Sequence, residues 1–234
     1  MAEESAATEG VQPFQVRKVQ ERSFFTRVFG GSRTSDAEAA VDNLIAERGL
    51  DNVDVVAIDN CLCQAGVRDK PAKGVLLNVW RHAVERFVAT DGTLDSAEAV
   101  FLDRLKCVLG LDATTAYSER DSVLANEFVA RARPLISGSD ATSEETRSAI
   151  SRLAQQLRIP PDKQKSLLKP LAQAAFDSIC QYWFGKRRID TATVNALLAF
   201  KKEYDPSLAD SELNKLVRCW HLALLDQGVM RLTH

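Results

Sequence analysis

The spacing of apolar residues along the chain predicts an all-α protein. From Asp36 onward apolar residues recur every three or four positions, which is the period of an amphipathic helix. No long stretch alternates apolar and polar residues as a half-buried strand does, and no Asn-Gly or Asp-Gly turn separates two such stretches. We therefore expect about nine helices, over residues 37–48, 52–65, 71–89, 96–109, 116–136, 144–157, 162–184, 191–204 and 210–229.

Three of these helices begin with similar segments at a nearly fixed spacing of 48 and 47 residues. Each segment carries a residue that can cap the first backbone N–H groups of its helix; these residues are Asp95, Ser143 and Asp190. The apolar residues that follow also correspond, in the sets Leu102, Ile150 and Leu197; Leu105, Leu153 and Phe200; and Leu109, Leu157 and Tyr204. Helices of similar length give some periodicity by chance, but the shared caps favour tandem helical hairpins. Residues 36–234 are then one repeat domain, an elongated bundle or a short solenoid.

The first 35 residues differ from this pattern. Residues 1–13 are small and acidic and end at Pro13, which is typical of a disordered tail. Residues 14–35, which we call the arm, mix aromatic and basic side chains and contain one acidic residue, Glu21. Such a segment suits a groove on a partner or an anionic membrane surface, and it equally suits a helix across the chain's own core. The candidate partner-binding residues are Phe14, Arg17, Lys18, Arg22, Phe25, Arg27 and Phe29.

Composition narrows the function classes. Thirty basic and 32 acidic residues give a formal charge of −2, so the chain lacks the global positive field that attracts nucleic acid. The longest apolar stretches are too short to cross a bilayer, and we expect a soluble protein. The acidic N-terminus does not resemble a secretory signal. Five scattered cysteines predict buried free thiols in a reducing compartment such as cytoplasm, stroma or matrix.

One turn carries candidate metal ligands. The segment from Asp91 to Glu98 resembles the second half of an EF-hand loop, with Gly92 at the turn and carboxylates at Asp91, Asp95 and Glu98. The earlier ligand positions of such a loop are apolar here, so a divalent cation would need oxygen atoms from elsewhere. The alternative is structural, with Asp95 as a helix cap and Glu98 as its capping partner.

Local enzyme motifs are absent from the sequence. It contains no glycine loop for phosphates, no Gly-x-Ser-x-Gly segment and no Glu-x-x-His pair for a di-iron bundle. No cofactor is therefore expected apart from a divalent cation. An active site assembled from residues far apart in the sequence stays open.

The stretch from Phe87 to Asp112 resembles the tellurite-resistance TerB-like helical family. It has an apolar helix, an Asp-Gly-x-apolar turn, an acidic residue and a second helix that ends in Leu109-Gly110-Leu111. The tandem arrangement is also similar to the helical repeats of the chloroplast inner-envelope import scaffold. The first resemblance implies a metal-responsive stress protein with the acidic turn as its site, and the second implies a scaffold.

We therefore expect a non-enzymatic helical scaffold or accessory subunit. It would bind a protein partner, within a larger or membrane-associated assembly, and the arm would make the contact. The alternatives are a TerB-like metal-binding stress protein and an enzyme with a nonlocal active site.

Overall fold

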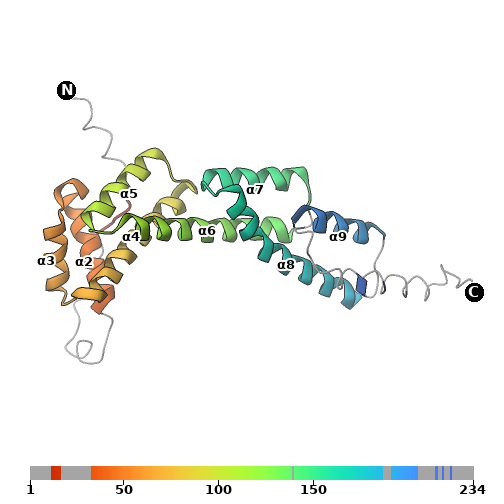
Figure 1. Ribbon diagram of the computed structural model, residues 1–234, viewed down its shortest axis with the longest axis horizontal. Coiled ribbons are helices and arrows are strands. Elements are labelled where there is room, and N and C mark those ends of the chain that lie inside the picture. The colour runs from red at the N-terminus through yellow and green to blue at the C-terminus, as the bar shows by residue number, and fades with distance from the viewer. Residues whose placement is uncertain are drawn as a thin grey trace, which may run out of the picture. The chain divides into compact units, whose positions relative to one another are not determined.

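The computed structural model describes residues 12–16, 33–138, 140–186 and 191–204, together with Asn214, Lys215, Arg218 and Leu222. All regular secondary structure in this part of the chain is helical, which confirms the all-α prediction (Figure 1). The α-helices are α2 (Arg33–Arg48), α3 (Val55–Gln64), α4 (Asp69–Asp91), α5 (Ser96–Val108), α6 (Ala113–Ser137), α7 (Glu144–Gln156), α8 (Pro161–Lys186) and α9 (Thr191–Tyr204). A short 3₁₀ helix, η1 (Leu50–Asn52), lies between α2 and α3.

Each predicted helix between residues 37 and 204 matches one of these helices, with ends shifted by a few residues. The first one begins at Arg33, so the last residues of the predicted arm belong to α2. The ninth predicted helix, over 210–229, lies largely outside the described residues. Four residues of that range are described, and all four are helical and exposed.

Side-chain caps set the starts of α3, α5, α6 and α7. Before α6, the Asp112 carboxylate accepts a hydrogen bond from the Thr115 N–H at 3.0 Å. The carboxylate of Asp54 accepts a hydrogen bond from the Ala57 N–H at 2.8 Å, and the Ser143 hydroxyl accepts one from the Thr146 N–H at 3.1 Å. Before α5, Asp95 and Glu98 form the reciprocal capping box that the sequence predicts. These contacts are local, which explains why the sequence places the helix starts so well.

The helices α3, α5 and α7 end in the same backbone turn. The residue after each C-cap has a positive φ: 75° at Gly66, 61° at Gly110 and 52° at Arg158. The next N–H then donates back to the helix, from Val67, Leu111 and Ile159, as in a Schellman motif. Of these three residues, only Arg158 has a Cβ atom, and its positive φ costs about 1 kcal/mol.

Helix boundaries recur along the chain at an offset of 48 residues. The starts of α5 and α7, Ser96 and Glu144, are separated by this offset, as are the starts of α6 and α8. The core follows the same offset, because the three bulkiest fully buried side chains among the described residues are Trp80 of α4, Phe128 of α6 and Phe176 of α8. Of the residue sets that the sequence analysis aligns, all are buried except Tyr204, which is partly exposed. A long helix followed by a short one is thus the recurring element, whereas a solenoid stacking stays a prediction.

The chain divides into two compact units, with the boundary between Leu124 and Ala125 inside α6. The single repeat domain that the sequence analysis expects over 36–234 stays a prediction. In unit 1, α2 packs on α3 and α4, and α4 packs on α5. In unit 2, α8 packs on α9, and Arg147 of α7 forms an ion pair with Glu203 of α9 at 3.0 Å.

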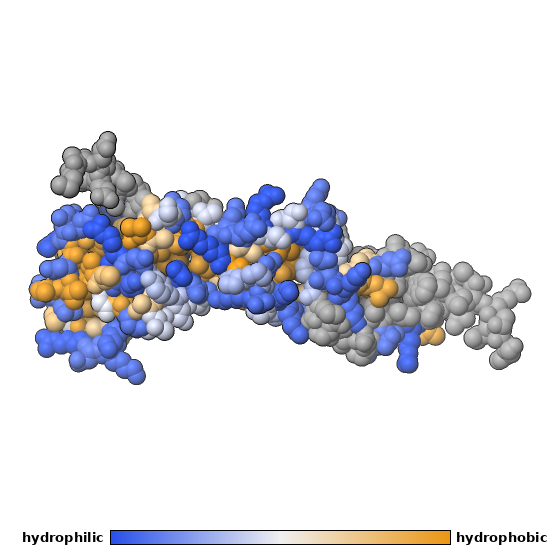
Figure 2. All heavy atoms as spheres, turned by 45° about the horizontal axis from the view of Figure 1, so that its top comes forward, coloured by the Kyte–Doolittle hydropathy of each residue, from blue (hydrophilic) through white to orange (hydrophobic). Residues whose placement is uncertain are grey.

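The surface combines hydrophilic and apolar areas. Figure 2 shows apolar side chains exposed among hydrophilic ones on one face of unit 1. The exposed large apolar residues include Val55 and Val56 at the start of α3. No described helix has the length and apolar character that a membrane span requires.

Candidate functional site

Residues 12–16, which we call the strap, lie in a groove of unit 1 in non-helical conformation. The Gln12 side chain donates to the Ile45 carbonyl of α2 at 3.0 Å, and the Arg86 side chain of α4 donates to the Pro13 carbonyl at 3.2 Å. Phe14 is only 4% exposed, and its ring centroid lies 6.3 Å from that of Phe101 in α5. The strap therefore contacts three helices that follow it in the chain.

The arginine that binds the strap, Arg86, also forms a buried ion pair. Arg86 donates to the Asp42 carboxylate of α2 at 3.0 Å, and Asp42 is 1% exposed. The second oxygen of this carboxylate, Oδ1, has no hydrogen-bond partner among the described residues. The Arg86 guanidinium also lies 5.5 Å from the centroid of the Phe14 ring, a cation–π distance. One arginine therefore joins α2, α4 and the strap.

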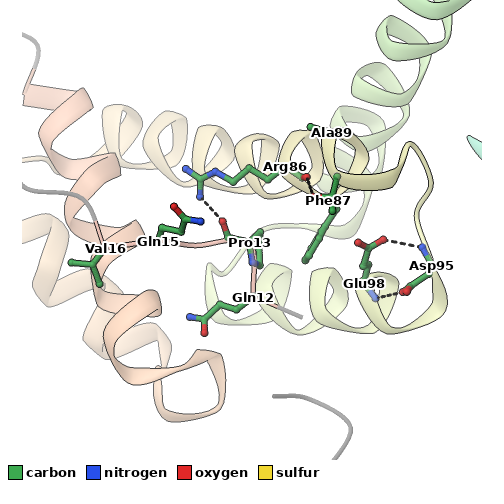
Figure 3. Close-up of a pocket in the computed structure, with 10 residues that line it drawn as sticks. Gln12, Pro13, Gln15, Val16, Arg86, Phe87, Ala89, Asp95 and Glu98 are labelled. Atoms are coloured by element: carbon green, nitrogen blue, oxygen red, sulfur yellow. Dashed lines mark hydrogen bonds between the residues drawn. The ribbon is translucent and has the colours of Figure 1, made fainter. Parts of the chain in front are cut away.

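An open groove of about 660 Å³ lies beside the strap (Figure 3). Phe87 points from α4 toward α5, where its ring meets Phe101 edge-on at 5.5 Å. The groove is lined by Gln12, Pro13, Gln15, Val16, Arg86, Phe87, Ala89, Thr90, Asp95 and Glu98. Residues of the predicted acidic turn therefore lie in the same groove as the first residues of the predicted arm.

The two acidic side chains of this groove, Asp95 and Glu98, each accept a hydrogen bond from the backbone N–H of the other residue. Asp95 accepts from the Glu98 N–H at 2.7 Å, and Glu98 accepts from the Asp95 N–H at 2.9 Å. Asp91, the third predicted ligand, ends α4, and its side chain lies outside the described residues. The described residues contain no group of three or more His, Cys, Asp or Glu side chains that could hold a metal ion. The geometry here is that of a helix cap.

The predicted partner-binding residues divide into two sets. Phe14 packs inside unit 1 and offers almost no surface to a partner, which agrees with the alternative that the start of the arm lies on the chain's own core. Gln12 and Pro13, assigned to the disordered tail by the sequence analysis, also contact unit 1. The other predicted residues lie outside the described residues; they are Arg17, Lys18, Arg22, Phe25, Arg27 and Phe29.

A second polar cluster joins α5 to α6. The Tyr117 hydroxyl donates to Asp103 at 2.8 Å, and Lys106 donates to that hydroxyl at 2.8 Å. The Tyr117 hydrogen bond, helped by Lys106, lowers the pKa of Asp103, and the bond to Tyr117 raises the pKa of Lys106. Both groups therefore stay charged at neutral pH. Asp103 is exposed, whereas Lys106 and Tyr117 are partly buried. The cluster lines none of the grooves described here, so it acts as a link between helices.

The described cysteines differ from the prediction of buried thiols. Cys63 and Cys107 are exposed, and Cys61 is half-buried because it lies at the edge of the α2–α3 contact. Burial raises the pKa of the Cys61 thiol, which keeps it protonated and weakly nucleophilic at neutral pH.

Comparison with protein-family models, with curated proteins and with solved structures finds no match to this chain. The resemblances to the TerB-like family and to the import scaffold therefore stay predictions. The function has to be argued from the strap and its surroundings.

The sequence analysis missed Gln12, Asp42 and Arg86. The sequence does contain a signal for the Asp42–Arg86 ion pair. Asp42 lies on the helical face of α2 that also carries Ala37, Val41 and Ile45. A carboxylate on an apolar face predicts a buried cation opposite it. The spacing of residues along the sequence does not indicate which helix supplies this cation.

Proposed function

We propose that this chain is a non-enzymatic helical scaffold that binds a protein partner through residues 17–32 of its arm. The observation that carries the proposal is the strap. Val16 ends a segment bound to α4 and α5, and Arg33 begins α2, so both ends of the sixteen residues between them are attached to unit 1. Attachment at both ends lowers the conformational entropy that these residues lose on binding.

The composition of residues 17–32 supports a polar, acidic contact surface on the partner. This stretch contains Arg17, Lys18, Arg22 and Arg27 and, as its only acidic residue, Glu21. Three phenylalanines in the same stretch supply apolar area, the combination found in interface hot spots. In the adjacent groove, Asp95 and Glu98 are used for capping. Gln12 and Arg86 hold the strap, which favours an interaction role over catalysis.

The test uses charge reversal in the full chain. Deleting residues 1–35 is unsuitable, because it also removes the buried Phe14 ring and the start of α2. We expect R22E/R27E to reduce the amount of co-purified partner at least tenfold at about 0.15 M salt. Quantitative mass spectrometry after affinity purification from the source cells measures this amount.

The matched control is R152E/K165E, which makes the same change of charge at exposed positions of α7 and α8. It should leave co-purification unchanged, and both double variants should keep the wild-type thermal transition. Equal recovery of the partner with R22E/R27E and wild type would refute the assignment of the arm.

A further inference from the structure

An apolar groove of about 570 Å³ lies between α6 and α8 in unit 2. It is lined by Val129, Arg133, Ser137, Pro170, Leu171, Ala174, Ala175, Ser178 and Ile179. Small side chains at Ala174 and Ser178 leave room for side chains of another helix, and both positions are exposed. This groove shares no lining residue with the strap groove and belongs to the other unit.

One cation lies in this apolar groove. Arg133 is the charged residue among the described lining residues, and it is exposed. It forms no hydrogen bond or ion pair with any described residue, whereas its neighbour Arg131 pairs with Glu127. A complementary helix would carry a carboxylate between apolar side chains, because an apolar surface alone would leave the guanidinium unpaired.

The chain itself displays such a helix. On α3, Val55 is 45% exposed and Val56 is 64% exposed. Asp59, one turn further along, is exposed, and no described residue pairs with its carboxylate. With Asn60 and Cys63 on the same side, these residues make an exposed face that we call the α3 ridge.

The dimensions and the charges of the two surfaces match. The ridge from Val55 to Cys63 is about 12 Å long, and the α8 side of the groove from Pro170 to Ile179 is about 13 Å long, at 1.5 Å per helical residue. Residues 33–124 contain 16 acidic and 10 basic residues, while residues 125–234 contain 12 acidic and 16 basic residues. Opposite net charges favour contact between unit 1 of one copy and unit 2 of another.

We propose that the α3 ridge of one copy docks in the α6–α8 groove of a second copy, with Asp59 beside Arg133. The two surfaces differ, so the contact is heterologous and can repeat from copy to copy. The proposal is independent of the partner assigned to the arm. The interface is small, and we expect a dissociation constant on the order of 10⁻⁴ M.

Sedimentation equilibrium of the purified full chain tests this proposal. We expect the weight-average mass to rise above 25.8 kDa with concentration and to pass the mass of two chains. Both R133E and D59R place like charges together, and each should weaken association at least tenfold. Both positions are exposed, so the variants should fold, and circular dichroism and thermal melting check this.

Mixing the two variants gives the sharpest outcome. In an equimolar mixture every contact between the two variants joins opposite charges, either the native pair or its reverse. The mixture should therefore associate far better than either variant alone. The double variant R133E/D59R should recover association, because the pair is then reversed in every copy. The controls R152E and E85K, which change charge at exposed positions outside both surfaces, should behave as wild type.

Three results would overturn the proposal. The first is a monomer at all concentrations up to about 1 mM, ten times the expected dissociation constant. The second is self-association that R133E and D59R leave unchanged. The third is a mixture of the two variants that associates no better than either variant alone.

Discussion

Units 1 and 2 are built from the same long and short helices but are held together differently. In unit 1 the contacts around the strap are buried: Arg86 joins Asp42 and Pro13, and Phe14 packs on Phe101. In unit 2 the ion pair between distant residues lies nearer the surface, where Arg147 of α7 pairs with Glu203 of α9. The same succession of long and short helices can therefore bind the strap in unit 1 and leave an open groove in unit 2.

The difference has an energetic consequence. Exposed ion pairs contribute little to stability, whereas breaking a buried pair leaves a charge without solvent or partner. Substitutions of the buried Asp42–Arg86 pair should therefore be costly in unit 1, and substitutions of the exposed Arg147 ion pairs should be mild in unit 2. Substitutions of the shared core should be costly in both, because Trp80 and Phe176 occupy equivalent buried positions.

The largest effect is expected from removing these aromatic cores. Trp80→Ala should lower the free energy of unfolding of unit 1 by about 4–5 kcal/mol, and Phe176→Ala should lower that of unit 2 by about 3–4 kcal/mol. The Trp80 substitution should cost more unfolding free energy because the indole N–H donates to the Ala116 carbonyl at 2.9 Å. The variant leaves this carbonyl unpaired. Hydrogen exchange in increasing urea, followed by mass spectrometry, measures each unit separately. Equal loss in both units from either variant would mean that the units unfold together.

The buried ion pair should give the next largest effect, and an asymmetric one. Arg86→Met leaves the Asp42 carboxylate buried without a cation and should cost about 3 kcal/mol. Asp42→Asn should cost about 1 kcal/mol, because the Arg86 side chain is 24% exposed and can reach water. Urea unfolding measures both values, with protease sensitivity of residues 17–32 as a second readout of strap release. Equal costs would contradict the burial difference between the two partners.

The smallest effect is a pH dependence in unit 2. Burial, with the nearby Glu203 carboxylate, raises the pKa of Tyr204, whose hydroxyl donates to the Ala141 carbonyl. The folded state therefore keeps this proton more tightly than the unfolded state, whose tyrosine pKa is about 10. Stability is full below pH 10 and falls as the pH rises through the raised value.

Tyr204→Phe should remove this alkaline loss and cost about 1 kcal/mol at neutral pH through the lost hydrogen bond. Thermal melts between pH 7 and 11 measure both changes. Arg147→Ala, which removes exposed ion pairs of the same unit, should leave the neutral melting temperature almost unchanged. An alkaline loss that persists in Tyr204→Phe would assign it to another group.

The sequence predicts the helices well because the signals that set them are short-range. Asp95, Ser143 and Gly110 act on backbone groups within a few residues, and the apolar period acts within one or two turns. The candidate site was predicted only in fragments. The acidic turn and the start of the arm were both identified, but nothing in their spacing indicates that they line one groove.

The sequence by itself thus determined the helical class, most helix ends and the 48-residue recurrence, since local hydrogen bonds and side-chain spacing decide these features. The tertiary structure decided the two units, the binding of the strap and the α6–α8 groove. Arg86 and the Pro13 carbonyl are 73 residues apart in the chain, and Gln12 and Ile45 are 33 apart. Such contacts form only when whole helix faces pack, because no local pattern specifies which face meets which.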